Sequence, residues 1–362
     1  MYREILEMVR PSAVNPENAK RGTCAETIKT LTGKNASQAL DNAKTVLLGV
    51  NETSDKVRKA FYELYRHEKE SNITDMGNIL SIEDMSKITA FLADRNIFTV
   101  ILGNPDSIMY CYDALSNKTD KMVVSSIAPG LATDDNKYIS ELFNRRKSNL
   151  FDFNILAYQQ YLSSVEDVNL FNDNYFQTIR LGEVRNDVKT VEPMLRDSDM
   201  LSIDIQSVRY SDSMLCGAGP NGLYAEEICK LAALAGFADK LKIAIIFGFE
   251  NSVNELNTSY ILTAQTLWYL IEGYLNRKNE NILNNVKGLR KILVNLDSPS
   301  CRLVFYHSEL SERWWMEVED PVDSKTYITA CSEQDYRDAC NRETPVRWVW
   351  YGKKLIRNFK TR

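Results

Sequence analysis

The feature that constrains the fold most is a set of short apolar runs separated by longer amphipathic stretches. The apolar runs, rich in β-branched and aromatic residues, predict strands at 44–50, 98–103, 121–127, 175–182, 199–205 and 242–249. The stretches between them place apolar residues at i, i+3 and i+4, which predicts helices at 54–70, 81–96, 183–198, 220–236 and 257–278. Alternating strands and helices favour a parallel sheet, and near-continuous apolar runs indicate strands covered on both faces. We therefore expect an α/β fold of three layers, α/β/α, with a mostly parallel, doubly wound sheet.

The sequence divides into three parts by its pattern. Residues 1–40 place apolar and charged residues at helical spacing and predict a helical lead-in. Residues 41–300 contain neither a repeat nor a low-complexity linker, and we assign them to one α/β domain. Residues 301–362 are rich in aromatic residues, with strand-like segments, a short helix at 332–343 and an alternating run at 348–352. We expect a small C-terminal β-rich appendage packed on the main domain, because so many aromatic side chains would otherwise be exposed.

Composition excludes several classes of function. The net charge is −5 and basic residues are interspersed with acidic ones until the last few positions, so we expect no nucleic-acid partner. No apolar run is long enough for a signal peptide or a membrane span, which predicts a cytoplasmic protein with no membrane partner. The seven cysteines form no CxxC pair, which argues against a zinc knuckle or a disulfide framework. Only two histidines, His67 and His307, are available to any mechanism that needs imidazole.

Polar residues follow one another at alternate positions near the end of the predicted strand at 199–205. Ser202, Asp204 and Gln206 should share one face of this strand, with Ile203 and Ile205 on the other. Doubly wound folds place their sites at the carboxyl ends of buried parallel strands. The segment is therefore the first candidate for a functional site.

This segment resembles the S-x-D-x-D strand of the ureohydrolases (arginase, agmatinase, formimidoylglutamase), which supplies two metal-binding aspartates to a binuclear manganese centre. Asp204 matches the first aspartate, and Gln206 replaces the second. The segment "VILGNPDSIMYCYDAL" is similar to the family's "LGGDHS" turn, with Asp106 where a metal-binding histidine belongs. The segment "VVSSIAPGLATDD" takes the place of the D-A-H-x-D motif and offers no ligand at positions 126–131. The resemblance thus implies an arginase-like fold with degenerate metal motifs.

Further segments extend the resemblance over roughly residues 40–362. "GPNGLYAEE" is similar to the family's glycine turn and helix start, and the family loop "GVRANxGRxGA" is shortened to "GVNETSDKVRKAF". The segments at 178–205, 231–241 and 263–279, with "RWWMEV" at 313–318, look most like the bacterial formimidoylglutamase-like group. Members of the family commonly form homo-oligomers, so the resemblance implies self-association as well.

Asp106, Asp204 and Gln206 predict a vestigial metal site. Two acids and one amide are too few to hold two bridged divalent ions, although they could hold one hard cation loosely. The alternative is that Asp204 hydrogen-bonds a neighbouring backbone group or Ser202, and that Asp106 caps the helix beginning near Ser107. We expect a catalytically inactive protein of the ureohydrolase fold, without a cofactor, retained for binding or assembly. The competing expectation is a divergent metal-dependent C–N hydrolase that uses Mn²⁺ and acts on a formimino or guanidino substrate.

Two further features have both a functional and a structural interpretation. The resemblance places Glu227 at the position whose carboxylate, in arginases, approaches the guanidinium of the substrate; structurally, it would be a carboxylate in the first turn of a helix. The tryptophans at the C-terminal end favour core packing, but one side of them could form an interaction surface. That surface, for a second copy or another protein, would consist of Trp314, Trp315, Trp348 and Trp350.

Overall fold

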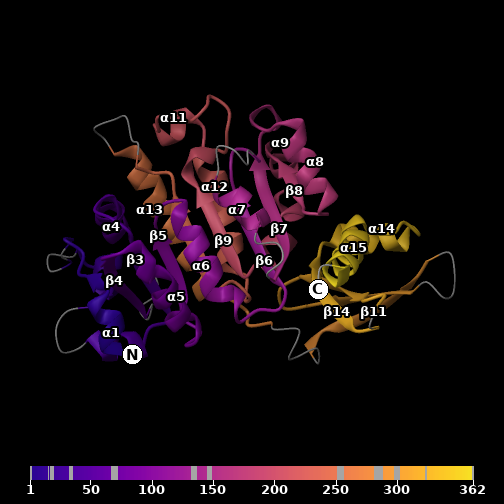
Figure 1. The fold of residues 1–362 in the computed structure, drawn as a ribbon, viewed down its shortest axis with the longest axis horizontal. Coiled ribbons are helices and arrows are strands. Elements are labelled where there is room, and N and C mark those ends of the chain that lie inside the picture. Colours follow the sequence, from indigo (N-terminus) through magenta and orange to yellow (C-terminus); the bar gives the residue numbers. More distant parts are fainter. Residues whose placement is uncertain are drawn as a thin grey trace.

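A ten-stranded sheet forms the centre of the protein, and a four-stranded sheet near the C-terminus lies to one side of it (Figure 1). The structure is a computed structural model. It describes residues 2–14, 16, 20–31, 36–66, 72–131, 137–144, 149–250, 257–280, 288–296, 302–322 and 324–360.

The large sheet has the strand order β1-β4-β3-β5-β10-β9-β6-β7-β8, with β2 also paired to β4. Only β1 is antiparallel to its neighbour among these pairs, so the expected mostly parallel sheet is confirmed. The strands are β1 (Val9–Arg10), β2 (Lys29–Thr30), β3 (Thr45–Gly49), β4 (Ile73–Ile79), β5 (Phe98–Leu102), β6 (Met122–Ile127), β7 (Leu150–Tyr158), β8 (Thr178–Arg180), β9 (Met200–Asp204) and β10 (Ile243–Phe247).

The strands β4 and β7 lie outside the runs that the sequence predicts, although both are buried along their whole length. Each contains acidic and amide side chains that interrupt its apolar character, such as Asp75 and Asn78 in β4. The segment 1–40, for which a helical lead-in is expected, contains helices and also β1 and β2, which pair with β4 and extend the sheet.

Helices cover both faces of the large sheet. Alternate strand residues pack into opposite cores: in β3, Val46 and Leu48 join one core, while Leu47 joins the other. The first layer, on the side of Leu47, contains α2 (Cys24–Thr27), α4 (Thr53–Glu63), α9 (Leu181–Asn186), α10 (Glu192–Arg196), α12 (Ala225–Gly236) and α13 (Thr258–Leu275). The second layer contains α1 (Tyr2–Glu7), α3 (Ala36–Asp41), α5 (Met85–Ala93), α6 (Asp106–Ser116), α7 (Lys137–Asn144) and α8 (Val165–Asp173).

The boundary between β6 and β9 is a switch point of this doubly wound sheet. The chain leaves β6 toward α7 in the second layer, and it leaves β9 toward α12 in the first layer. The crossovers on the two sides of this boundary therefore diverge, which opens a space at the carboxyl ends of the two strands.

The smaller sheet is antiparallel and begins at Arg290, within the range 41–300 assigned to the main domain from the sequence. Its strands are β11 (Arg290–Asn295), β12 (Arg302–His307), β13 (Trp314–Glu319) and β14 (Thr326–Cys331), followed by α14 (Glu333–Cys340) and α15 (Val346–Lys360). The short helix expected at 332–343 is confirmed by α14. The strand-like interpretation of 348–352 is wrong, because α15 continues through this run. Trp348, Tyr351 and Leu355 are spaced for one face of a helix and pack in a cluster with Val123 and Phe151.

Buried polar contacts attach the smaller sheet and α15 to the main body. Lys354 of α15 forms an ion pair with Asp152 of β7, and both side chains are buried. Burial lowers the pKa of Lys354, and the carboxylate of Asp152 opposes that effect. Arg196 of α10 donates a hydrogen bond of 3.0 Å to the carbonyl of Cys331, at the end of β14. The C-terminal part is therefore joined to the sheet by charge as well as by apolar packing.

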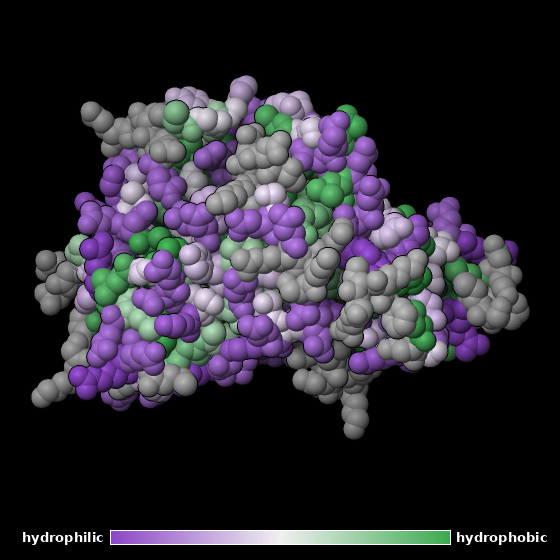
Figure 2. Space-filling model, viewed as in Figure 1, coloured by the Kyte–Doolittle hydropathy of each residue, from purple (hydrophilic) through white to green (hydrophobic). Residues whose placement is uncertain are grey.

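The surface in Figure 2 is mainly hydrophilic, and its hydrophobic residues lie in small separate patches. No described helix is both long enough and apolar enough to cross a membrane.

Candidate functional site

The candidate site lies where β6, β9 and β10 end, beside the switch point. In the sheet register, Ser126 of β6 is the partner of Ser202 in β9, and Asp204 is the partner of Phe247 in β10. Ser126, Ser202 and Asp204 project from the face of the sheet that packs on the second layer, as the alternation along β9 predicts.

Asp204 ends β9 and caps the turn that follows it. Its Oδ1 accepts a hydrogen bond of 2.9 Å from the backbone N–H of Gln206, within the 3-10 turn Ile205–Ser207. The expectation that Asp204 hydrogen-bonds a neighbouring backbone group is therefore confirmed. Because the turn interrupts the strand, Gln206 does not continue the alternation of Ser202 and Asp204.

Burial controls the charge of Asp204. The side chain is 6% exposed, and burial raises the pKa of this carboxyl group to about 7. The N–H of Gln206 lowers the pKa, and the negative charge of Glu250 raises it further. Burial also raises the pKa of Glu250. Asp204 thus lies in surroundings that favour a neutral carboxylic acid.

Gly248 makes the close approach between Asp204 and the end of β10 possible. Its φ is +78°, and a Cβ built on it would lie 2.3 Å from Oδ1 of Asp204. A side chain at this position would displace the carboxyl group or strain the backbone, so glycine is required by both the space and the dihedral angle.

Tyr138 of α7 fills the space above Ser126 and Ser202. Its hydroxyl lies 3.1 Å from Oγ of Ser126, which accepts a hydrogen bond of 2.8 Å from Oγ of Ser202. Its ring packs edge-on against Phe247, with 5.9 Å between the centroids, and the residue is 3% exposed. Burial raises the pKa of Tyr138, and the nearby Asp204 adds to that rise. The space at the switch point therefore contains a neutral phenol and two serine hydroxyls.

Asp106 lies on the solvent side of Tyr138. It is exposed at the first position of α6 and borders a cavity of about 350 Å³, of which Tyr138 forms another wall. The predicted capping role of Asp106 is wrong: the N–H of Ser107 donates instead to Oδ1 of Asn104, at 3.1 Å. Asp106 is exposed, whereas Asp204 is buried and does not line this cavity.

These side chains do not fit a binuclear manganese centre. Two divalent ions need several carboxylates, usually with imidazole, converging at one place. Within the described ranges, no three histidine, cysteine, aspartate or glutamate side chains cluster closely enough to hold a metal ion. His307 lies in β12 and its Nε2 is 3.2 Å from Oε2 of Glu312, whereas His67, assigned to a helix from the sequence, lies outside the described residues.

Glu227 already binds a guanidinium group from within the chain. Its two carboxylate oxygens accept hydrogen bonds of 3.1 and 3.3 Å from Nε of Arg185 in α9. Oε2 also accepts a hydrogen bond of 2.8 Å from the N–H of Tyr224, at the start of α12. Arg185 further donates to the carbonyl of Gly222 at 2.5 Å and stacks 4.3 Å from the ring centre of Tyr224. The guanidinium of Arg185 thus makes the contact with Glu227 that, according to the resemblance, a substrate would make.

The four tryptophans do not form one surface. Trp314 and Trp315 are neighbours in β13 and point to opposite faces of the small sheet. Trp314 stacks on Tyr336 with 4.5 Å between the ring centroids, and Trp315 packs under the guanidinium of Arg196. Trp348 donates to the carbonyl of Glu317 at 3.0 Å, and Trp350 is half-buried in α15.

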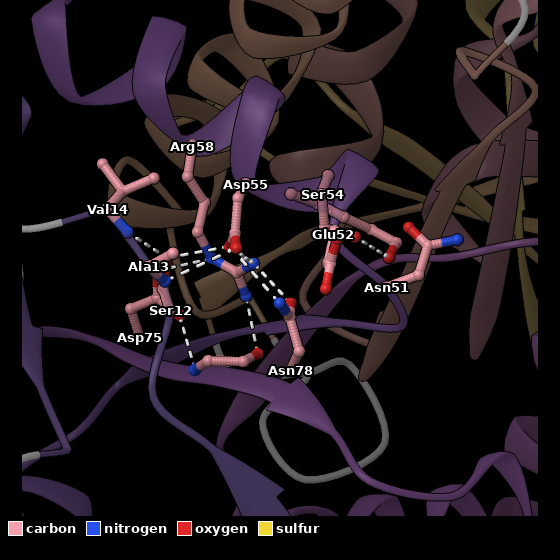
Figure 3. A network of polar contacts seen from close by, with 12 residues as sticks. Ser12, Ala13, Val14, Asn51, Glu52, Ser54, Asp55, Arg58, Asp75 and Asn78 are labelled. Carbon is pink, nitrogen blue, oxygen red and sulfur yellow. Dashed lines mark hydrogen bonds and ion pairs between the residues drawn. The ribbon is translucent and has the colours of Figure 1, made fainter.

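A buried charged network at the ends of β3 and β4 has no counterpart among the residues singled out from the sequence (Figure 3). Arg58 of α4 is fully buried and forms ion pairs with Asp75 at 2.8 Å and Asp55 at 2.9 Å. Its Nη1 also donates to Oδ1 of Asn78, at 2.6 Å. Arg58 and Asp55 lie in the segment "GVNETSDKVRKAF", where the sequence shows only a shortened loop followed by a helix. In the sequence, the one indication of this network is Arg58, an arginine among the apolar positions of a predicted helix.

Comparison with solved structures identifies the fold. Formimidoylglutamase from Bacillus subtilis has a TM-score of 0.60 and 14% identity; the match covers 72% of this chain and 94% of that one. A Trypanosoma cruzi formiminoglutamase solved with Mn²⁺ has a TM-score of 0.54 and 17% identity, covering 66% and 95% of the two chains. The agmatine ureohydrolase of Thermoplasma volcanium also has a TM-score of 0.54 and 17% identity, covering 71% and 96%.

No protein-family model matches the sequence, and a comparison with curated proteins gives no match. At these identities the structural likeness concerns the backbone, and each solved structure is matched over nearly its whole length. The chain therefore has the arginase-like α/β fold of the ureohydrolases, with an additional antiparallel sheet near its C-terminus.

Proposed function

We propose that this protein is a non-catalytic form of the ureohydrolase fold, retained for binding or assembly. The position of Tyr138 is the observation that carries the proposal. Hydrolysis of a formimino or guanidino carbon at neutral pH requires a strong nucleophile, which paired metal ions supply by lowering the pKa of bound water. At the corresponding end of this sheet, the phenol of Tyr138 packs against serine hydroxyls, and burial raises the pKa of Asp204 to about 7.

The contacts of Glu227 support the same proposal. A substrate guanidinium would have to displace Arg185, which holds the carboxylate and the carbonyl of Gly222 at once. Charge-assisted hydrogen bonds of this kind are among the stronger polar contacts in proteins. The arrangement favours a stable internal contact over exchange with a ligand.

A metal-dependent C–N hydrolase is the second candidate, and one observation favours it. The negative charge of Glu250 acts on the carboxyl group of Asp204 near Gly248, beside the amide-bearing Gln206. Oxygen donors of this kind suit a single hard cation with water in its remaining positions. Asp106 is exposed while Asp204 is buried, so the candidate cation is placed at Asp204.

A turnover assay distinguishes the two candidates. Purified protein incubated with Mn²⁺ and formimidoylglutamate, arginine or agmatine should release no product, while the Bacillus subtilis formimidoylglutamase serves as the positive control for formimidoylglutamate. The metal content after dialysis should be well below one ion per chain, by elemental analysis. Turnover that is abolished by Asp204→Ala but kept in Asp106→Asn would replace the proposal with the hydrolase.

A further inference from the structure

A groove runs along α12 and α13, beside Leu64 and Tyr65. A Cβ at Gly236 would lie 2.2 Å from the carbonyl of Leu270, and one at Gly273 would lie 2.3 Å from the carbonyl of Ala233. These glycines bring the two backbones together near the ends of both helices. The groove has a volume of about 640 Å³ and is lined by Leu64, Tyr65, Ala225, Glu226, Cys229, Lys230, Ala233, Gln265, Trp268 and Tyr269.

Large apolar side chains along this groove are exposed. Tyr65 is 51% exposed, and Ile261 and Tyr269 are each 44% exposed. Ile261, Gln265 and Tyr269 follow one another at four-residue intervals and so form one stripe along α13. Trp268 holds the opposite wall in place by donating a hydrogen bond of 2.9 Å to the carbonyl of Tyr65. The stripe and the groove together form a fixed, largely apolar face.

Opposite charges lie one helical turn apart on the α12 side of the groove. Glu226 and Lys230 are both exposed, and neither makes an ion pair within 4.0 Å with any residue that the structure describes. Arg209 lies near enough to feel the charge of Glu226 without such a pair. When a second α12 runs antiparallel across a two-fold axis, Glu226 of each copy faces Lys230 of the other. The charges of this face are thus complementary to the same face of a second copy.

The lining favours a protein partner over a small molecule. Small-molecule sites combine apolar walls with a few convergent polar groups that fix the orientation of the ligand. Here the polar side chains Glu226, Lys230 and Gln265 lie exposed on the surfaces of two helices. Exposed aromatic residues surrounded by charged ones are instead typical of protein interfaces.

We propose that the face formed by Tyr65, α12 and α13 is the interface of a symmetric dimer of this chain. The proposal names a partner for the assembly role proposed above and rests on that role. In the dimer, Tyr269 and Ile261 of each copy are covered by the other, and two Glu226–Lys230 pairs close the interface across the axis. This face belongs to the first helical layer, whereas Tyr138 and the candidate site face the second.

Charge reversal tests the pairing directly. The wild-type protein should be dimeric by light scattering after size exclusion, at concentrations of tens of micromolar. Glu226→Lys alone and Lys230→Glu alone each place like charges opposite one another twice, and each should raise the dimer dissociation constant at least about tenfold. An equimolar mixture of the two variants should restore the dimer, because both pairs are then complementary. Tyr269→Lys should also give a monomer.

Controls separate the loss of the interface from the loss of the fold. Glu333→Lys and Arg337→Glu reverse an exposed ion pair on α14, where the partners are 2.7 Å apart, and should leave the dimer intact. Circular dichroism should be the same for all variants. A monomeric wild type, a dimer that resists every reversal, or a mixture that stays monomeric would overturn the proposal. Catalytic turnover would overturn the proposed function and leave this interface standing, so the two failures are distinguishable.

Discussion

Replacing Asp204 by asparagine should stabilise the protein at neutral pH. The pKa of the buried carboxyl group is about 7 in the folded protein, against 3.8 for an ordinary aspartate. Because the folded protein holds this proton more tightly, unfolding releases it between pH 3.8 and 7, and the free energy of unfolding falls as the pH rises through that window. The difference between the two pKa values corresponds to about 4 kcal/mol of unfolding free energy, at about 1.4 kcal/mol for each tenfold change in the protonation equilibrium. Asparagine keeps the Oδ1 acceptor for the N–H of Gln206 and removes the titration.

Urea unfolding at pH 4 and at pH 8 measures this effect for the wild type and for Asp204→Asn. The stability of the variant relative to the wild type should increase by up to about 4 kcal/mol between the two pH values. Asp106→Asn, at an exposed position, is the control and should leave the pH dependence unchanged. Parallel curves for the wild type and Asp204→Asn would refute the raised pKa of Asp204. A variant that is less stable at pH 8, with Mn²⁺ stabilising only the wild type, would show that the carboxylate of Asp204 binds a metal ion.

The buried ion pairs give two further predictions. Arg58→Met should lower the free energy of unfolding by about 3–5 kcal/mol, because Asp75 would remain as a buried charge without its partner; equilibrium urea unfolding measures the loss, and a loss below about 1 kcal/mol would contradict it. Lys354→Met should cause a loss of similar size, because Asp152 would remain as a buried charge without its partner. The same assay measures this loss, and proteolysis after α14 should be faster. Lys118→Met, which removes an ion pair with the exposed Asp94, is the matched surface control and should change stability by less than about 1 kcal/mol.

The sequence was most informative where strands are apolar on both faces. The strands β3, β5, β9 and β10 could be predicted because they contain no charged residue before their last position. β4 and β7 escaped prediction because their polar residues have partners far away in sequence: Asp75 pairs with Arg58, and Asp152 pairs with Lys354. No local pattern can show that a buried acid will find a cation elsewhere in the chain.

The candidate site was only partly predictable for a similar reason. The alternation along β9 correctly places Ser202 and Asp204 on one face, since it depends on strand geometry alone. The role of Tyr138 depends on how α7 packs across the strand ends, which its local sequence does not reveal. The partner of Glu227 was equally hidden, because Arg185 comes from a different helix, 42 residues earlier.

The ion pair between Asp152 and Lys354 also bears on how the chain is made. Their separation of 202 residues means that β7 has left the ribosome long before the lysine is synthesised. Until then, the carboxylate of Asp152 has water in place of its ammonium partner, and the side chain of Phe151 lacks the cover of Tyr351. A nascent chain that stops short of α15 thus exposes the apolar side chain of Phe151 and the unpaired carboxylate of Asp152 in β7 to chaperones and proteases. Synthesis of α15 is therefore the step that gives Asp152 its ion-pair partner and covers Phe151.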